Sequence, residues 1–425
     1  MTTVGIIAEF NPFHNGHKHL INQAKKITKA DYVIVIMSGN FLQRGEASIY
    51  NKFTRAKMAV SEGVDLVIEL PVAYSTGSAL DFSNGAINIL DKLNSIDYLC
   101  FGSENIDTVL FNKITDVIIN EPAKYKLALK DNLSKGASYP MARENALVDY
   151  FKSENISSFI SSPNNILAIE YYSSIKRINS SIKPIPIPRL NSAYHSIDIS
   201  NTLSSATSIR TYIEDNIKNI SNEADFSNLM KAIAHTIPQN TLEILIKEYN
   251  KTGPVFPNYI LPFLQYSILT HNNLSHICDI DHDLSNKITK ISPYNKYDDI
   301  IHLLKSKNYT STRITRGLIH CILNYTRDNR ERFINNNYGF YANILAFRKD
   351  SSKLIKEISI KSQIPLITKK ANFQSYFNEY PNINYSVAKE LWDFDLLASN
   401  IYNCLLYNMY STEQKNDLET TPIIV

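Results

Sequence analysis

The chain has 425 residues, more than one ordinary hydrophobic core holds, so we expect two or three domains. Its 44% hydrophobic and 20% charged residues and its net charge of +3 fit a soluble globular protein, and no apolar run is long enough to span a membrane. The four cysteines are scattered without a CxxC pair, which favours a reducing compartment over a disulfide framework. The start lacks a leader pattern, so we expect a cytoplasmic protein.

The first predicted element is a buried strand followed by a loop and a helix. Val4–Ala8 is an apolar run, and the segment after Gly16 has a helical pattern with Leu20, Ala24 and Ile27 on one face. A loop that opens a helix directly after a buried strand is where an α/β sheet exposes backbone N–H groups to an anion. This stretch is therefore a predicted phosphate-binding site.

His14 and His17 form an HxGH pattern with Gly16 in that loop. Imidazoles at a helix N-terminus can donate to phosphate oxygens, and the glycine lets the backbone come close. HxGH alone is weak in a chain with 10 histidines, and a capped turn with two solvated imidazoles explains it about equally well. The strand before it and the helix after it favour the phosphate interpretation.

Strand-like and helix-like segments then alternate. The predicted strands are 31–37, 64–70, 97–101 and 182–187, and the predicted helices are 51–62, 83–93, 166–175 and 204–214. Pro184 and Pro186 indicate that the last strand lies at an edge or ends early, and residues 105–158 are expected to form a mostly helical excursion. The alternation predicts an α/β fold with a doubly wound, mostly parallel sheet in a first domain of residues 1–215.

Residues 216–425 have a different character, with helical periodicity and few strand-like runs. Tyr309–Thr326 has the pattern of an amphipathic helix, and Tyr341–Phe347 that of a short strand or turn. The tail after Ser411 is polar, and we expect it to be loosely held. A mainly α-helical second domain of residues 216–425 follows from this pattern.

The charge of this second half is unevenly distributed. From Lys305 to Lys356 there are eleven Lys and Arg against three Asp and Glu, a formal charge of +8, so the rest of the chain carries −5. Such asymmetry is typical of a polyanion-binding region, in which Tyr309 and Tyr325 are candidates for stacking on an unpaired base. A cluster of His271, His276, Cys278 and His282 matches no standard zinc spacing, so no metal site is predicted.

Several segments taken together resemble one family. In chain order they are AEFNPFHNGH, MSGNFLQRGEAS, NKFTRAKMAVSEGVDLVIELP, FGSE, SPNNILAIEY, PRLNSAYHS, SSATSIR, STRITRGLIHCILN and LAFRKDSSKLIKEI. They resemble the bacterial tRNA(Met) cytidine acetate ligase family, which has an HxGH nucleotidyltransferase-like domain followed by an α-helical domain. The departures are small: Phe10 replaces an expected tyrosine, Ala47-Ser48 replaces a frequent proline, and SSATSIR keeps Thr207, Ile209 and Arg210 of the ISSTxIR pattern.

The resemblance implies a two-step reaction. ATP would activate acetate to acetyl-adenylate, and the acetyl group would pass to N4 of the wobble cytidine of elongator tRNA(Met), giving N4-acetylcytidine. It implies ATP with Mg²⁺, the latter held largely by phosphates and waters, and as partners acetate and this tRNA but neither DNA nor a membrane.

The same resemblance implies roles for individual residues. His14, His17 and Arg210 would stabilise charge on phosphoryl oxygens, with Arg210 clamping the pyrophosphate from across the crevice. Besides the two histidines, the implied ATP-binding residues are Ile7, Ala8, Glu9, Phe10, Asn11, Pro12, Phe13, Asn15, Gly16, Lys18, His19, Leu20, Gly102, Asn164, Asn165, Arg189 and Thr207.

Some assignments stay open at this point. The loop of residues 38–48 carries Asn40, Gln43, Arg44 and Glu46, which could orient acetate or the incoming cytosine. The base for acetyl transfer, the choice between Asn164 and Asn165, the selection of the tRNA and the oligomeric state are not assigned. Two other functions fit the residues: a small-molecule adenylyltransferase or amide-forming synthetase of the same superfamily, and a non-catalytic RNA-binding protein.

Overall fold

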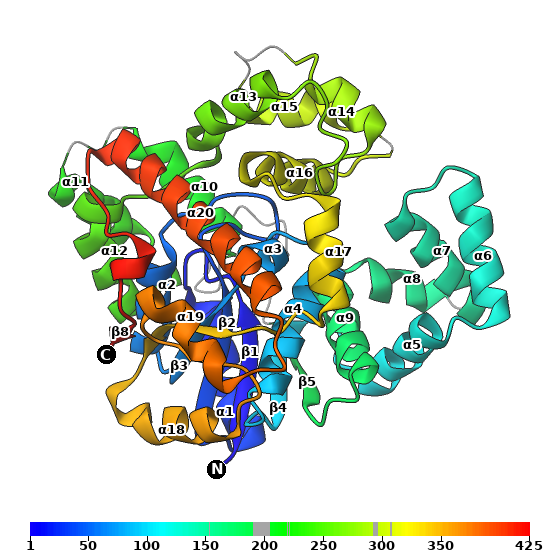
Figure 1. Ribbon diagram of the computed structural model, residues 1–425, viewed down its shortest axis with the longest axis horizontal. Coiled ribbons are helices and arrows are strands. Elements are labelled where there is room, and N and C mark those ends of the chain that lie inside the picture. Colours follow the sequence, from blue (N-terminus) through cyan, green and yellow to red (C-terminus); the bar gives the residue numbers. More distant parts are fainter. Residues whose placement is uncertain (153, 190–204, 219, 221, 292–295, 307) are drawn as a thin grey trace.

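The computed structural model describes residues 1–152, 154–189, 205–218, 220, 222–291, 296–306 and 308–425. Its strands are β1 (Thr3–Ala8), β2 (Tyr32–Ser38), β3 (Leu66–Leu70), β4 (Tyr98–Ser103), β5 (Lys183–Pro188), β6 (Ala342–Phe347), β7 (Leu366–Ile367) and β8 (Ile423–Ile424). Within these residues they form one sheet in the order β5-β4-β1-β2-β3-β6-β7, with β8 paired to β6 (Figure 1).

Helices surround this sheet on both faces. The N-terminal half contributes α1 (Asn15–Thr28), α2 (Lys52–Ser61), α3 (Val72–Ser75), α4 (Ala79–Lys92), α5 (Thr108–Asn120), α6 (Ala123–Ser134), α7 (Tyr139–Phe151), α8 (Glu154–Ser161) and α9 (Pro163–Arg177). The C-terminal half contributes α10 (Ala206–Ile217), α11 (Glu223–Ala232), α12 (Gln239–Thr252), α13 (Leu261–Thr270), α14 (His282–Ile288), α15 (Tyr297–Leu304), α16 (Ser311–Leu323), α17 (Arg327–Asn335), α18 (Ser352–Lys361), α19 (Phe373–Tyr376) and α20 (Tyr385–Tyr410). No helix among the described residues is both long and apolar enough to cross a membrane.

The first five strands are all parallel, as the alternation predicted. Strand β5, with its two prolines, lies at the edge, which also confirms that prediction. From β1 the order runs through β2 to β3, whereas β4 lies on the opposite side of β1. The order therefore reverses next to β1, and in open α/β sheets ligands bind at the carboxyl ends of the strands at such a point.

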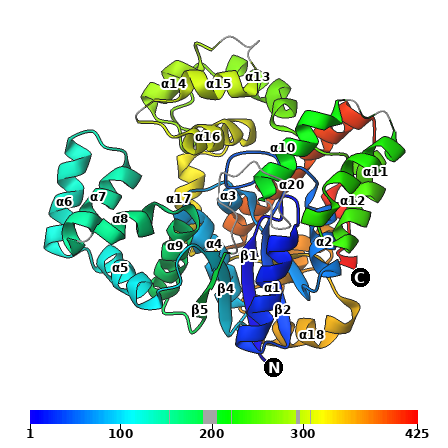
Figure 2. The same cartoon turned by 180° about the vertical axis from the view of Figure 1, so that it is seen from behind.

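The two faces of the sheet bury separate apolar clusters. Ile6 of β1 packs in one cluster with Ile21 and Ala24 of α1, and Figure 2 shows α1 in front of β1. Ile7, the next residue of β1, faces the other way and joins a cluster with Leu90 of α4. This alternation is what a strand buried on both faces requires, because successive side chains point to opposite sides.

The buried face of α1 and the start of α4 differ from the sequence prediction. Helix α1 buries Ile21, Ala24 and Thr28, whereas Ile27, predicted to face the core, is 51% exposed. The apolar stripe therefore runs one residue out of phase with the prediction. Helix α4 begins at Ala79, four residues early, because the Ser78 side chain caps it by accepting from the Asp81 N–H.

The C-terminal half returns to the central sheet. Strand β6 pairs antiparallel with β3, and β7 and β8 then add to β6. Pairing with β6 covers the edge of the fully buried strand β3, which would otherwise expose its backbone groups. The run Tyr341–Phe347 is thus a strand rather than a turn, while the division of the chain at residue 215 stays a prediction.

The polar tail is held in place, contrary to the prediction from its composition. Asp417 is 3% exposed and accepts a hydrogen bond from the buried Lys52 ammonium, which also bonds both carboxylate oxygens of Glu69 at 2.8 and 2.9 Å. A buried ammonium needs compensating carboxylates, and the tail supplies one of them. The predicted loose tail was therefore wrong for this segment.

Candidate active site

A cavity of about 610 Å³ opens at the carboxyl ends of β1 and β4, where the strand order reverses. The predicted residues that line it are Ile7, Ala8, Glu9, Phe10, Asn11, His14, Gly16, His17, His19, Leu20, Gly102, Asn164, Arg189, Thr207 and Arg210. The predicted residues that do not line it are Pro12, Phe13, Asn15, Lys18 and Asn165. The structure thus brings segments from five regions of the chain to one cavity.

The two histidines cap the helix that opens the cavity wall. His14 is the N-cap of α1, and its Nδ1 accepts from the Gly16 N–H at 3.0 Å. The Nδ1 of His17 accepts from the His14 N–H at 3.2 Å, so the two side chains form a reciprocal capping box, and their rings lie with centroids 3.8 Å apart at an angle of 31°. Each ring must therefore carry its proton on Nε2, the nitrogen left free to donate.

Burial keeps both imidazoles neutral. Desolvation, with a further contribution from the charges of Arg189 and Arg210, lowers the pKa of His14 to about 3. Desolvation followed by the effects of His14 and Arg189 holds the pKa of His17 well below its ordinary value. Two neutral N–H donors at a helix N-terminus are suited to phosphate oxygens and poorly suited to accepting a proton.

A second helix N-terminus contributes to the cavity wall. Ser205 caps α10 by accepting from the Ser208 N–H, and Ser205, Ala206 and Thr207 line the cavity. The Arg210 guanidinium donates to the Asn11 carbonyl at 2.8 Å and lies 3.3 Å from a carboxylate oxygen of Glu46. Arg210 thus joins α10 to the loop that precedes α1. The motif residues 190–204, which include most of PRLNSAYHS, lie outside the described residues.

The loop of residues 38–48 adds Gln43 and Arg44 to the lining. The Arg44 guanidinium donates to the Thr207 hydroxyl at 3.4 Å, and the Gln43 backbone N–H donates to a carboxylate oxygen of Glu9 at 3.0 Å. The fully buried Arg55 holds the ends of β1 and β2 together, since its guanidinium donates to the carbonyls of Glu9 and of Ser38. The loop therefore lies where it can touch a ligand bound at the histidines.

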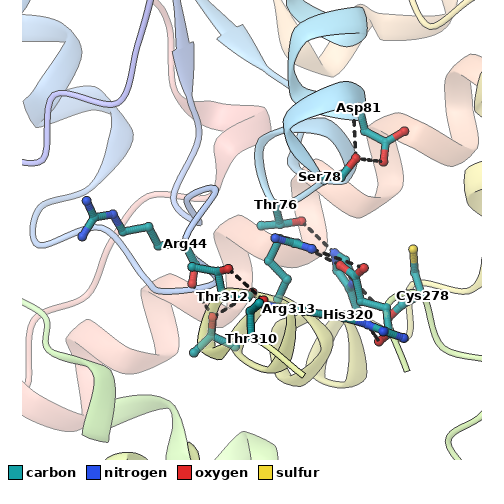
Figure 3. Close-up of polar contacts among 12 residues, drawn as sticks. Arg44, Thr76, Ser78, Asp81, Cys278, Thr310, Thr312, Arg313 and His320 are labelled. Atoms are coloured by element: carbon teal, nitrogen blue, oxygen red, sulfur yellow. Dashed lines mark hydrogen bonds and ion pairs between the residues drawn. The ribbon is translucent and has the colours of Figure 1, made fainter. Parts of the chain in front are cut away.

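Helix α16 from the C-terminal half holds this loop. The Thr315 hydroxyl donates to the Arg44 carbonyl, and a Cβ on Gly45, whose φ is +71°, would lie 2.2 Å from the Arg316 backbone nitrogen. Figure 3 shows Arg44 beside α16 with its guanidinium directed away from that helix. Thr312 and Arg316 of α16 also line the cavity, so both halves of the chain build it.

Gly102, Asn164 and Arg189 lie on the β4–β5 side of the cavity. The Asn164 amide donates to Glu104 at 2.6 Å, and Arg189 donates to the Asn164 side-chain oxygen at 3.4 Å. Phe101 and Tyr171 line the same side with rings 5.3 Å apart, and the sequence reasoning did not select them. Aromatic and apolar residues of this kind suit a flat base better than a phosphate.

Asn165 has a structural role in this part of the molecule. It is 1% exposed, its Oδ1 accepts from the Ser103 hydroxyl at 2.6 Å, and its amide donates to the Phe159 carbonyl at 2.9 Å. It therefore ties the end of β4 to the start of α9, and only its neighbour Asn164 faces the cavity.

Part of the positive charge of the basic segment 305–356 is neutralised by ion pairs. Several of its arginines form ion pairs: Arg313–Asp281, Arg316–Asp279, Arg330–Asp81, Arg332–Glu390 and Arg348–Asp350. Four of these five carboxylates come from outside the segment, so part of the +8 is cancelled by acids distant in sequence. Tyr309 and Tyr325 are 5% and 2% exposed, which corrects the expectation that they stack on a base.

No group of His, Cys, Asp and Glu among the described residues is arranged to hold a metal ion.

Comparisons with known proteins give consistent results. A model of the family described as HIGH Nucleotidyl Transferase matches residues 1–417. A tRNA(Met) cytidine acetate ligase of Caldanaerobacter subterraneus subsp. tengcongensis is 39% identical over 410 residues, 96% of each chain, and one of Acetivibrio thermocellus is 38% identical over 95% of this chain and 94% of its own. The crystal structure of Thermotoga maritima TmcAL bound with alpha-thio ATP is similar over 100% of this chain and 99% of that one, with 28% identity and a TM-score of 0.90.

Proposed function

The chain belongs to the tRNA(Met) cytidine acetate ligase family of HIGH nucleotidyl transferases, and on this premise we propose that it is an ATP-dependent acetate ligase. It joins acetate and ATP into acetyl-adenylate and then transfers the acetyl group to N4 of the wobble cytidine of elongator tRNA(Met). The family predicted from the motifs is confirmed, and so is the mostly parallel α/β fold.

The reciprocal capping by His14 and His17 is the observation that carries this proposal. When an acetate oxygen attacks the α-phosphorus and pyrophosphate leaves, negative charge spreads over phosphoryl oxygens. Two neutral Nε2–H groups at the N-terminus of α1 are placed to donate to those oxygens. Arg210 and the N-terminus of α10 supply further positive charge from another wall of the same cavity.

The nucleoside half of ATP is assigned to the β4–β5 side. There Gly102 leaves room for the base, and Phe101 and Tyr171 offer apolar surface. Asn164 and Arg189 supply polar groups for the ribose or the α-phosphate. Asn165 acts indirectly, by holding the end of β4.

Magnesium accompanies ATP in this proposal and neutralises charge on the triphosphate when bound. Among the described lining residues Glu9 is the carboxylate, so the donor set fits an ion held by phosphates and waters rather than by a protein cage. Acetate, the tRNA and a cytoplasmic location belong to the same proposal.

The decisive experiment combines the protein, ATP, labelled acetate and unmodified elongator tRNA(Met). We expect acetate-dependent exchange of pyrophosphate into ATP without tRNA, and labelled N4-acetylcytidine after nuclease digestion when tRNA is present. Exchange that ignores acetate would refute the acetyl-adenylate step. Turnover of a soluble metabolite without RNA, or salt-sensitive RNA binding unaffected by ATP, would instead support one of the two alternative functions.

A further inference from the structure

We propose that Glu9 is the general base of the acetyl-transfer step, the group that accepts the proton leaving the cytidine N4 amine. This inference rests on the proposed function and deepens it, since ligation to an amine needs a proton acceptor beside the mixed anhydride.

The position of Glu9 is the first argument. It follows β1 directly and lies on the cavity wall between the histidine loop and the loop of residues 38–48. One carboxylate oxygen accepts from the Gln43 N–H at 3.0 Å, which fixes the orientation of the carboxyl group. Gln43 in turn belongs to the loop held by α16, so Glu9 is oriented by a second layer of contacts.

The other groups on the wall are the second argument. His14 and His17 use Nδ1 to accept backbone N–H groups and carry their protons on Nε2, so neither offers a free basic nitrogen. Burial raises the pKa of the Tyr171 phenol, which keeps it protonated. Among the described lining residues this leaves Glu9 and His19 as proton acceptors.

The electrostatic surroundings agree with the position. Burial raises the pKa of Glu9, and the Glu46 carboxylate adds to the rise, whereas the Gln43 hydrogen bond and the charges of Arg44 and Arg210 oppose it. Tyr171 of α9 and Arg55 of α2 also face this carboxylate. A carboxylate made more basic in this way is a better proton acceptor near neutral pH than a solvated one.

The step balances without any further reactant. The N4 lone pair attacks the carbonyl carbon of acetyl-adenylate and forms the N–C bond. The bond between that carbon and the phosphate oxygen breaks, and AMP leaves with the electron pair. The N4 proton passes to the Glu9 carboxylate, which returns it to solvent when the products leave.

The test compares the two half-reactions in the full-length protein. In Glu9→Gln the amide oxygen still accepts from the Gln43 N–H, but the side chain cannot take a proton. Because Glu9 is also among the implied ATP-binding residues, we expect acetate-dependent pyrophosphate exchange to fall by up to about tenfold, and acetyl transfer to tRNA to fall by about 10²- to 10⁴-fold. Wild-type transfer should rise with pH through the carboxyl titration, and this dependence should disappear in Glu9→Gln, while Glu9→Asp recovers part of the rate.

A matched control is Glu357→Gln, because Glu357 lies on α18 and pairs with Lys361, away from the cavity. It should leave both half-reactions unchanged. Equal loss of exchange and transfer in Glu9→Gln would overturn the inference and make Glu9 an ATP-site residue. Selective loss of transfer in His19→Gln with an active Glu9→Gln would also overturn it.

The outcome for the wild type separates this inference from the proposed function. Wild-type protein that does not acetylate tRNA overturns the function, and the role of Glu9 with it. Active wild-type protein together with a fully active Glu9→Gln overturns the role of Glu9 alone.

Discussion

Replacing Gly45 by alanine should separate the loop of residues 38–48 from α16. The added Cβ would lie 2.2 Å from the Arg316 backbone nitrogen and 2.3 Å from the Thr315 carbonyl carbon, and neither backbone atom can move aside as a flexible side chain would. The φ of +71° is a second cost, because L-residues in the left-handed region lose about 1–2 kcal/mol. Relief of the clash requires the loop or the helix to shift.

The magnitude follows from adding the clash to the backbone cost. Overpacking typically costs about 1–3 kcal/mol, so we expect the free energy of unfolding to fall by about 2–5 kcal/mol in total. A shift of the loop would also break two hydrogen bonds, the one of 3.4 Å from the Arg44 guanidinium to the Thr207 hydroxyl and the one of 3.0 Å from the Gln43 N–H to Glu9. Acetyl transfer should therefore drop by at least about tenfold at a temperature where the variant is fully folded.

Gly136→Ala is the matched control. Gly136 has a φ of +80°, and its Cβ would meet no atom within 4 Å, so only the backbone cost of about 1–2 kcal/mol applies. Urea unfolding monitored by circular dichroism gives both free energies, and N4-acetylcytidine formation gives the rates. Equal destabilisation of the two variants, with full activity of Gly45→Ala, would refute the contact with α16 as the support of the loop.

Three further predictions follow from the buried groups. His17→Ala should abolish acetate-dependent pyrophosphate exchange but retain tRNA binding in a filter assay; loss of tRNA binding instead would contradict its assignment to the phosphates of ATP. The folded-state pKa of His14 is about 3, so between about pH 6.5 and pH 3 the unfolded chain binds a proton that the folded chain does not. The free energy of unfolding should therefore decrease by about 1.4 kcal/mol for each unit by which the pH is lowered in this range. His14→Asn, which keeps a capping oxygen, should flatten that part of the urea-midpoint profile against pH, and an unchanged slope would argue against the buried neutral ring. Asp417→Ala should lower the free energy of unfolding by about 3–5 kcal/mol, because it removes a carboxylate from the buried Lys52. The control is Asp393→Ala, which breaks the exposed ion pair with Lys389 and should cost less than about 1 kcal/mol. Equal costs for the two variants would refute the role of burial.

Local patterns carried most of what could be predicted. The segment from Val4 to Leu20 contains strand, cap and helix within a few residues, so its sequence alone indicated this strand–loop–helix unit. Asn164 and Asn165 show where local information ends. Neighbouring residues on a helix point about 100° apart, and only the packing of α9 determines which of them faces the cavity.

Long-range contacts account for what could not be predicted. The Arg44 carbonyl meets Thr315 across 271 residues, and no local pattern signals that contact. The charge count over residues 305–356 could not include ion pairing for the same reason, since the partners of Arg313, Arg316 and Arg330 lie elsewhere in the chain. Polar tails are usually loose, but the tail here is ordered because Lys52 needs Asp417.

The pairing of Lys52 with Asp417 also constrains how the protein can be made. A ribosome adds 365 residues after Lys52 before Asp417 is in place, and β3 has no neighbour on its outer side until β6 has been synthesised. The early strands therefore emerge with the Lys52 ammonium paired to Glu69 but lacking its second carboxylate, and with an open sheet edge that favours association with other chains. Completion of the nucleotide-binding sheet is thus a late event, and a fragment ending near residue 215 would lack the residues that finish its own core.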